Sequence, residues 1–192
     1  MSMAASQPAS KSWPIVVMGV SGCGKTSIGV AIAARLGLAF VEGDVLHPRG
    51  NVEKMSAGIP LTDEDRWPWL DLLGAALRHA HQEGRGLVAS CSALKKSYRD
   101  RLRHGASGPV LFVFLHGSRA VLQARLAERG GHFFPPALLN SQFATLENPG
   151  DEPLVVTVDI DAHVDTIADR VLEGLGAFGV APARIKEKGT LR

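Results

Sequence analysis

The clearest pattern along the chain is the alternation of short apolar runs with longer segments whose apolar residues recur every three or four positions. This alternation is typical of a parallel sheet whose strands are joined by helices. Three of the short runs are rich in valine, as strands buried on both faces tend to be. The expected strands are 15–18, 39–42, 87–91, 110–115 and 154–158, and the expected helices are 25–36, 66–81, 95–104, 119–129 and 163–175.

Neither an internal repeat nor a long linker interrupts these elements. We therefore expect one three-layer α/β domain over 13–176, with insertions between the second and third strands and before the fifth. The small, polar segment 1–12 is expected to be a flexible tail. The segment 177–192 carries four basic residues against one acid and lacks helical periodicity, which predicts a solvated basic tail.

Composition narrows the class of protein. With 192 residues, 45% of them hydrophobic and 21% charged, the chain is neither collagen, coiled coil nor disordered. A net charge of +2 argues against a dedicated nucleic-acid binder. The two cysteines, Cys23 and Cys91, are too few for a disulfide scaffold and favour a reducing compartment. Because no secretory signal or membrane-spanning run is visible, we expect a cytoplasmic protein without a membrane partner.

The strongest motif follows the first expected strand and opens the first expected helix. It reads G-x-x-x-x-G-K-[ST] and is called the phosphate loop below. Its glycines let the backbone wrap around a phosphate, Lys25 reaches the transferable end, and the Thr26 hydroxyl is suited to Mg²⁺. The expected nucleotide-binding residues here are Gly19, Val20, Ser21, Gly22, Cys23, Gly24, Lys25 and Thr26.

Cys23 lies within this loop, beside a lysine and a helix N-terminus. Such surroundings lower the pKa of a thiol, so redox sensitivity is one hypothesis. The stronger explanation is that a small side chain suits this position whatever its reactivity.

Two acids follow the second expected strand, Glu42 and Asp44, with one residue between them. In an extended backbone they project to the same side, at the sheet edge that carries the phosphate loop. We assign Asp44 to orient an acceptor hydroxyl and take its proton, and Glu42 to hold Mg²⁺ directly or through water. The alternative is that both acids cap the helix that follows.

Basic residues cluster after two of the strands. His47 is suited to hydrogen-bond a hydroxyl. Arg49 is suited to bind a carboxylate or phosphate through two parallel hydrogen bonds. Lys95, Lys96 and Arg99 span one helical turn beyond the third strand, again at the edge where open α/β folds bind ligands. Solvated surface is the alternative for each of them. The tryptophans at 67 and 69 are expected in the core, with Pro68 in a first helical turn.

A second basic pair, Arg125 and Arg129, is spaced to share one helix face. The pair is a candidate for stacking on adenine or clamping phosphates, with an ordinary basic helix end as the alternative. The glycine- and aromatic-rich stretch that follows, which includes His132, has the composition of a lid that closes and excludes water.

These residues together resemble a known family, the gluconate kinases, small enzymes related in fold to shikimate and nucleoside monophosphate kinases. The resemblance covers about residues 15–175. It rests on GVSGCGKT at 19–26, GDVLHPRGNVEKMSAGIPLTDEDRWPWL at 43–70, CSALKKSYRDRLR at 91–103, and GHFF with QFATLENP within 131–149.

The resemblance implies sheet order 2-3-1-4-5, a lid near 129–136, and often a homodimer. It also implies transfer of phosphate from ATP, with Mg²⁺, to the 6-hydroxyl of D-gluconate, giving 6-phospho-D-gluconate and ADP. Lys25, Thr26 and Asp44 match the motifs, and Glu42 departs from the Asp-Gly-Asp typical of relatives. The implied gluconate or phosphate contacts are His47, Arg49, Lys96, Arg99 and His132.

Two other functions remain open on the residues alone. The same base and loop would serve a kinase for shikimate or another small hydroxy acid. A nucleotide-binding regulator without transfer activity is the second, although a passive binder has no need of Asp44 beside the terminal phosphate.

Overall fold

The computed structural model describes residues 13–128 and 136–182. Within these ranges, five strands form one parallel sheet in the order β2-β3-β1-β4-β5. The predicted fold class and strand order are therefore confirmed. The strands, each within one residue of its predicted bounds, are β1 (Pro14–Met18), β2 (Ala39–Glu42), β3 (Leu87–Ser90), β4 (Leu111–His116) and β5 (Val155–Asp159).

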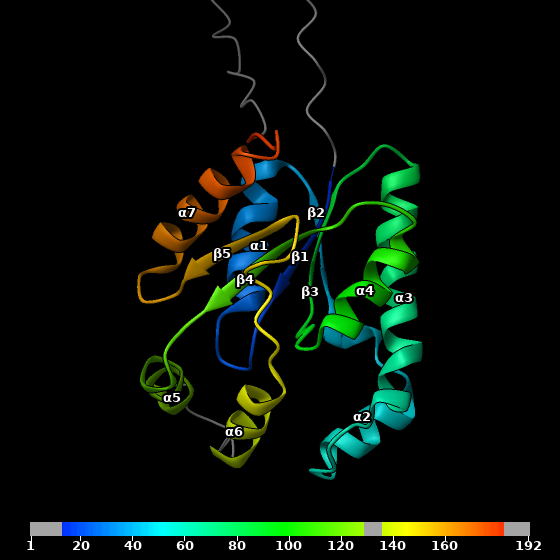
Figure 1. Ribbon diagram of the computed structural model, residues 1–192, viewed down its shortest axis with the longest axis vertical. Coiled ribbons are helices and arrows are strands. Elements are labelled where there is room, and N and C mark those ends of the chain that lie inside the picture. The colour runs from blue at the N-terminus through cyan, green and yellow to red at the C-terminus, as the bar shows by residue number, and fades with distance from the viewer. Residues whose placement is uncertain (1–12, 129–135, 183–192) are drawn as a thin grey trace, which may run out of the picture.

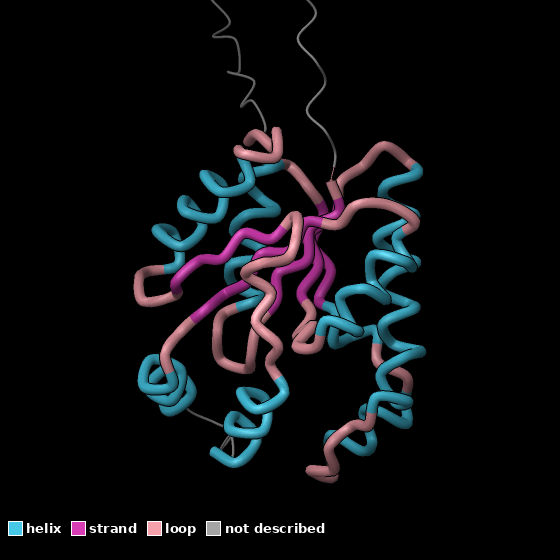
Figure 2. Tube along the Cα trace, viewed as in Figure 1, coloured by secondary structure: helices cyan, strands magenta, loops and turns pink. Residues whose placement is uncertain are grey.

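Helices cover both faces of this sheet (Figures 1 and 2). One face carries α1 (Lys25–Leu36) and α7 (Val164–Gly176), and the other carries α3 (Asp63–Gln82) and α4 (Lys96–Ala106). Alternate residues of a strand point to opposite faces. Accordingly, Ile15 and Val17 of β1 join the core beneath α1 and α7, whereas Val16 and Met18 join the core beneath α3 and α4.

The remaining helical segments gather beyond the carboxyl ends of the strands, at the lower end of the molecule in Figure 1. They are the 3₁₀ turn η1 (Gly43–Leu46), α2 (Arg49–Ser56), α5 (Arg119–Glu128) and α6 (Pro136–Thr145). The carboxyl edge of a parallel sheet is where open α/β folds bind ligands. These segments therefore surround the place where a site is expected.

The structure departs from the sequence predictions in the insertions. Helix α3 begins three residues early because Thr62 and Asp65 form a capping box, and Pro68 consequently lies inside the helix rather than in its first turn. Helices α2 and α6 were not predicted. In α2 the single fully buried residue is the polar Asn51, so the segment lacks the apolar periodicity that identifies a helix.

Several predicted segments lie outside the described residues. They are the N-terminal tail 1–12, the basic tail from 183 onward, and the expected lid apart from Pro136. None of the helices in the described ranges has the length and apolarity needed to cross a membrane.

Candidate functional site

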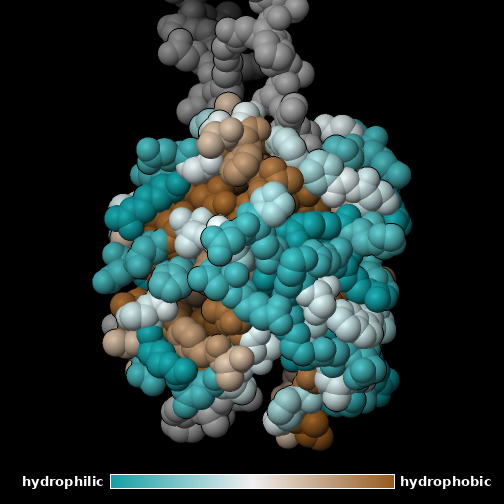
Figure 3. Space-filling model, viewed as in Figure 1, coloured by the Kyte–Doolittle hydropathy of each residue, from teal (hydrophilic) through white to brown (hydrophobic). Residues whose placement is uncertain are grey.

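A cavity of about 350 Å³ opens at the carboxyl edge of the sheet. In the space-filling view the surface is notched between the part built on α6 and the part built on α2 (Figure 3), and residues of both helices line the cavity. The wall also includes the phosphate loop, the first residue of α1, η1, the segments before and after α2, α3, and Ser92 beyond β3. The polar side chains that line the cavity include Ser21, Lys25, Asp44, His47, Arg66 and Gln142.

The phosphate loop has the geometry of an anion site. Gly24 is the N-cap of α1 and has a φ of 92°, a conformation that glycine adopts without strain. No side chain caps this helix, so its first N–H groups are available to an anion. Lys25 Nζ lies 3.1 Å from both the Gly19 and Val20 carbonyl oxygens. The loop therefore holds its lysine folded back over the position where a phosphate would bind.

The structure does not support the redox hypothesis for Cys23. This side chain is fully buried, and burial raises the pKa of its thiol, although Lys25 and Arg125 act in the opposite direction. The expectation of a lowered thiol pKa at this position is therefore wrong. Cys91 is also buried, as expected for the end of β3.

Glu42 is placed beside the phosphate loop by the end of β2. Its Oε2 accepts a hydrogen bond of 2.6 Å from Thr26 Oγ1, and its Oε1 accepts one from Ser90 Oγ. The Ser90 hydroxyl in turn accepts a bond of 3.0 Å from Gly43 N–H. Glu42 makes no capping bond to η1, so the capping alternative does not describe it.

The oxygens of Thr26 and Glu42 suit Mg²⁺, which binds proteins through one or two carboxylates together with substrate phosphates. In the described ranges no group of three or more histidine, cysteine or acidic side chains is arranged to hold a metal by itself. This donor set therefore fits a magnesium ion that arrives with the nucleotide.

Asp44 is exposed to the same cavity as Lys25. The 3₁₀ turn carries it there, directly beyond the strand end that bears Glu42. The predicted convergence of a carboxylate and the phosphate-loop lysine is therefore present in the structure.

His47 lines the cavity next to Asp44 and stacks on Trp69, with ring centroids 4.1 Å apart and an interplanar angle of 18°. Its Nδ1 lies 3.2 Å from Asn51 Nδ2, which can only donate, so Nδ1 accepts and Nε2 carries the proton. Burial lowers the pKa of His47, and Arg66 adds to this while Asp44 opposes it. The imidazole is thus held neutral, with an N–H to offer.

Trp69 holds the backbone before Asp44 and the His47 ring in place. It is buried, as predicted, and its Nε1 donates a 2.7 Å bond to the Gly43 carbonyl oxygen. The indole therefore fixes the backbone before Asp44 and at the same time supports the His47 ring.

The structure places three of the predicted anion contacts away from the cavity wall. The Arg49 side chain is 92% exposed and pairs with Glu53 at 2.6 Å on its own helix. Lys96 pairs with Asp100 one turn along α4. Both match the solvated-surface alternative rather than the predicted substrate contact.

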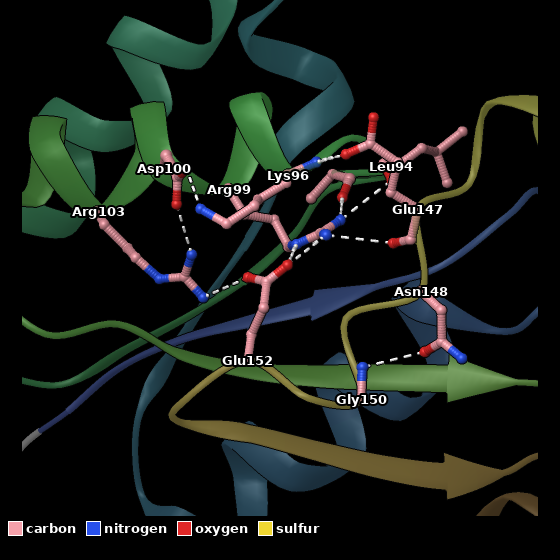
Figure 4. A network of polar contacts seen from close by, with 10 residues as sticks. Leu94, Lys96, Arg99, Asp100, Arg103, Glu147, Asn148, Gly150 and Glu152 are labelled. Carbon is pink, nitrogen blue, oxygen red and sulfur yellow. Dashed lines mark hydrogen bonds and ion pairs between the residues drawn. The ribbon is translucent and has the colours of Figure 1, made fainter.

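Arg99 is the largest departure, because its side chain is completely buried. Figure 4 shows its guanidinium surrounded by acceptors. Nη1 donates to the Ala93 and Leu94 carbonyl oxygens, and Nη2 donates to that of Glu147. Nε bonds Glu152 at 3.0 Å. With these partners Arg99 fastens the loop before α4 to the segment before β5, and it has no access to a ligand in the cavity.

Glu152 completes this network by bonding Arg103 as well (Figure 4). Burial opposes ionisation of the carboxyl, but Arg99 and Arg103 outweigh it and hold the pKa of Glu152 below its ordinary value. The network is an ion triad with a structural role.

Arg66 is a cavity residue that sequence reasoning missed. Its Nη1 donates to the carbonyl oxygens of Leu61 (2.6 Å) and Thr62 (3.2 Å) and faces Tyr98 Oη at 3.5 Å. All of these contacts use Nη1, so the Nε–Nη2 edge keeps the geometry that grips a carboxylate. The available signal was spacing, since Arg66 lies three residues before Trp69 on the same helix face.

Gln142 is the second missed residue. Its Oε1 accepts a 2.6 Å bond from the Ser21 backbone N–H, and its Nε2 donates a 3.0 Å bond to Ser21 Oγ. Gln142 opens the QFATLENP stretch that carries the resemblance, but because α6 was not predicted, that stretch did not place the side chain beside a loop 121 residues earlier in the chain.

Arg125 lies near the phosphate loop, with Nη1 3.9 Å from the position a Cβ would take at Gly24. Its Nη2 donates to the Ile160 and Ala162 carbonyl oxygens after β5. The predicted partners Arg129 and His132 lie outside the described residues.

Known proteins are similar to this chain over most of its length. A family model described as an AAA domain matches residues 15–149. A gluconokinase of Gluconobacter oxydans (strain 621H) is 51% identical over 158 residues, covering 82% of this chain and 88% of that protein. A thermosensitive gluconokinase of Escherichia coli (strain K12) is 47% identical over 164 residues, covering 85% of this chain and 87% of that protein.

Among solved structures, a gluconokinase from Sinorhizobium meliloti 1021 superposes with a TM-score of 0.82 at 50% identity, covering 89% of this chain and 95% of that one. At such identity over more than four fifths of its length, the chain belongs to the gluconokinase family, within the AAA-domain proteins.

Proposed function

We propose that this protein transfers the terminal phosphoryl group of ATP to the 6-hydroxyl of D-gluconate, giving 6-phospho-D-gluconate and ADP. The observation that carries the proposal is that Asp44 and the phosphate-loop Lys25 line one cavity. A base and an electrostatic stabiliser of the transferring group would therefore face one acceptor bound in this cavity.

The nucleotide phosphates would lie against the phosphate loop and the N-terminus of α1. Lys25 would leave the Gly19 and Val20 carbonyl oxygens for the more strongly charged phosphate oxygens. Thr26 and Glu42 would hold Mg²⁺, which when bound neutralises charge on the phosphates. Arg125, beside the loop, would contact the nucleotide, with Arg129 as a further candidate.

In the transfer, the 6-hydroxyl oxygen of gluconate forms a bond to the terminal phosphorus while the bond from that phosphorus to the ADP oxygen breaks. Asp44 accepts the hydroxyl proton. The neutral His47, with its proton on Nε2, donates a hydrogen bond to a gluconate hydroxyl and so orients the chain of the sugar acid.

The gluconate carboxylate needs a cation within the cavity. Arg66 supports this role because it lines the cavity. Its hydrogen bonds to the Leu61 and Thr62 carbonyl oxygens use Nη1 and not the Nε–Nη2 edge. A planar guanidinium binds a carboxylate with two parallel hydrogen bonds. Arg66 is therefore our candidate for the role that was predicted for Arg49, Lys96 and Arg99.

A coupled assay tests the proposal directly. Purified protein with ATP and Mg²⁺ is offered gluconate, shikimate, glycerate and nucleoside monophosphates in separate reactions. We expect turnover with gluconate well above the others. Turnover of another acceptor alone would identify a different kinase, and nucleotide binding without any transfer would identify a regulator.

We also propose a cytoplasmic location and a homodimer. Both cysteines are free and buried, which fits a reducing compartment. Light scattering of the purified chain gives its mass in solution and tests the dimer.

A further inference from the structure

The two-point contact between Gln142 and Ser21 joins the acceptor side of the cavity to the phosphate loop. Gln142 belongs to the cavity wall through α6, together with its neighbour Ser141. Ser21 is the third residue of a loop whose backbone N–H groups cradle phosphates. One amide group thus contacts the phosphate loop and also lines the cavity proposed for the acceptor.

The orientation of this amide follows from its partner. A backbone N–H can only donate, so the atom facing it must be the carbonyl oxygen Oε1. That oxygen, 2.6 Å away, occupies the direction from which a phosphate oxygen would approach the Ser21 N–H. The Gln142 side chain therefore competes with a phosphate for one donor of the loop.

The helix that presents Gln142 is firmly attached. Leu139 is buried in the core, and the Arg119 guanidinium lies 4.6 Å from the centre of the Phe143 ring. Just beyond α6, the Glu147 N–H bonds the Leu94 carbonyl oxygen at 2.9 Å. Glu147 is also held by Arg99 (Figure 4). With its helix fixed at these points, the side chain of Gln142 can exchange partners by a change of rotamer alone.

We propose that Gln142 is a positioning residue that occupies the Ser21 amide until a nucleotide phosphate displaces it, after which it hydrogen-bonds the acceptor in the cavity. This inference rests on the proposed function for the identity of that acceptor. Because the acceptor favours the displaced rotamer and so does the phosphate, gluconate and nucleotide strengthen each other's binding. The coupling factor is the same whichever ligand binds first.

The size of the effect follows from the worth of one hydrogen bond. A neutral hydrogen bond contributes about 0.5–1.5 kcal/mol relative to water, which corresponds to roughly 2- to 10-fold in a binding constant. Gln142→Leu, which keeps the volume and removes the amide, should therefore bind a nonhydrolysable ATP analogue about 2- to 10-fold more tightly. Its coupling to gluconate should fall by a similar factor.

The experiment measures the Kd of AMPPNP with Mg²⁺ by calorimetry, with and without saturating gluconate. The proteins are wild type, Gln142→Leu, Gln142→Glu and Ser21→Ala. Gln142→Glu keeps an acceptor but adds a negative charge, and should weaken AMPPNP binding. Ser21→Ala removes the hydroxyl partner only and should shift affinity in the direction of Gln142→Leu, by less. Gln82→Leu, at the exposed last residue of α3, is the matched control and should match wild type.

Tighter analogue binding in Gln142→Leu with reduced coupling is the expected result, and a residue with a merely structural role would not produce it. Unchanged or weaker binding in both Gln142→Leu and Ser21→Ala overturns the inference. If thermal unfolding shows that Gln142→Leu does not fold, the AMPPNP affinity of Ser21→Ala is the test. Tighter binding supports the inference, and unchanged or weaker binding overturns it. Failure of the proposed function is seen separately, because the wild-type protein would then form no 6-phosphogluconate whatever the analogue affinities are.

Discussion

At the scale of single residues, the site contains two kinds of side chain. The position of some follows from the local sequence, and the position of others depends on contacts between distant parts of the chain. Lys25 and Thr26 were predictable because they belong to the phosphate-loop motif, and Asp44 because it lies just beyond the carboxyl end of β2. Arg66 and Gln142 were not, because their approach to the cavity depends on how α3 and α6 pack. Arg99 was predicted to contact a ligand because it is charged. In the structure its guanidinium is buried and donates to carbonyl oxygens of the protein instead.

Replacing Arg66 or Arg49 with glutamine tests whether the arginine of the cavity or the exposed arginine binds the gluconate carboxylate. Arg66→Gln should raise the KM for gluconate by about 10-fold or more, because a charged hydrogen bond worth about 1.5–3 kcal/mol is lost. Arg49→Gln should change it little, because that guanidinium is exposed and lies off the cavity wall. Steady-state kinetics at saturating ATP give both values. A larger effect at Arg49 would restore the prediction made from sequence.

At the scale of elements, the strands and helices α1, α3, α4, α5 and α7 were predictable from the periodicity of their apolar residues. The 3₁₀ turn, α2 and α6 were not. The packing of α3 on α4 also lies beyond sequence reasoning. These helices meet at two glycines, where a Cβ on Gly74 would lie 3.0 Å from the Cα of Gly105.

Adding a side chain where α3 crosses α4 tests how closely these two helices pack. Gly74→Val should destabilise the protein by about 1–3 kcal/mol, because the added carbon atoms meet the backbone of α4 and force the helices apart. Gly50→Val is the control, since a Cβ at Gly50 meets nothing within 4 Å. Urea unfolding gives both free energies. Equal effects at the two positions would show that the close approach is absent in solution.

The ion triad gives a pH-dependent prediction at the same scale. Glu152→Gln should cost about 1–3 kcal/mol near pH 7, because Arg99 then loses its charged partner. The pKa of Glu152 is lowered in the folded protein. The pair therefore stabilises the fold fully above the ordinary glutamate pKa of about 4.3, and this contribution fades as pH falls through the lowered value.

Urea unfolding of wild type and Glu152→Gln between pH 3 and pH 7 measures the difference between them. We expect the difference to shrink toward acid. Glu53→Gln, which breaks an exposed i,i+4 pair with Arg49, should cost at most about 0.5 kcal/mol throughout. A difference for Glu152→Gln that stayed constant with pH would argue against the lowered pKa.

At the scale of the whole molecule, two helical layers enclose the sheet and leave its carboxyl edge open to ligands. This architecture followed from the alternation of apolar runs. The net charge of +2 did not indicate where charge gathers, since several basic groups are neutralised by acids far from the cavity.

The buried thiols report on the folded state as a whole. Burial raises the pKa of Cys91 to about 12 and also raises that of Cys23. Neither thiol should react with a disulfide reagent at pH 8 until urea unfolds the chain, because the thiolate is the reactive species. Cys91→Ser assigns any remaining reaction to Cys23. Rapid native reaction at Cys23, slowed by ATP, would revive the redox hypothesis.

In the proposed function, Asp44 acts as the base for phosphoryl transfer to gluconate. The most direct measurement is formation of 6-phosphogluconate from ATP, Mg²⁺ and gluconate by wild type and Asp44→Asn, alongside AMPPNP affinity of both. We predict product from wild type, a loss of about 100-fold or more in kcat for Asp44→Asn, and similar analogue affinity in the two proteins. Near-normal turnover in Asp44→Asn, or no 6-phosphogluconate from wild type, would contradict the account.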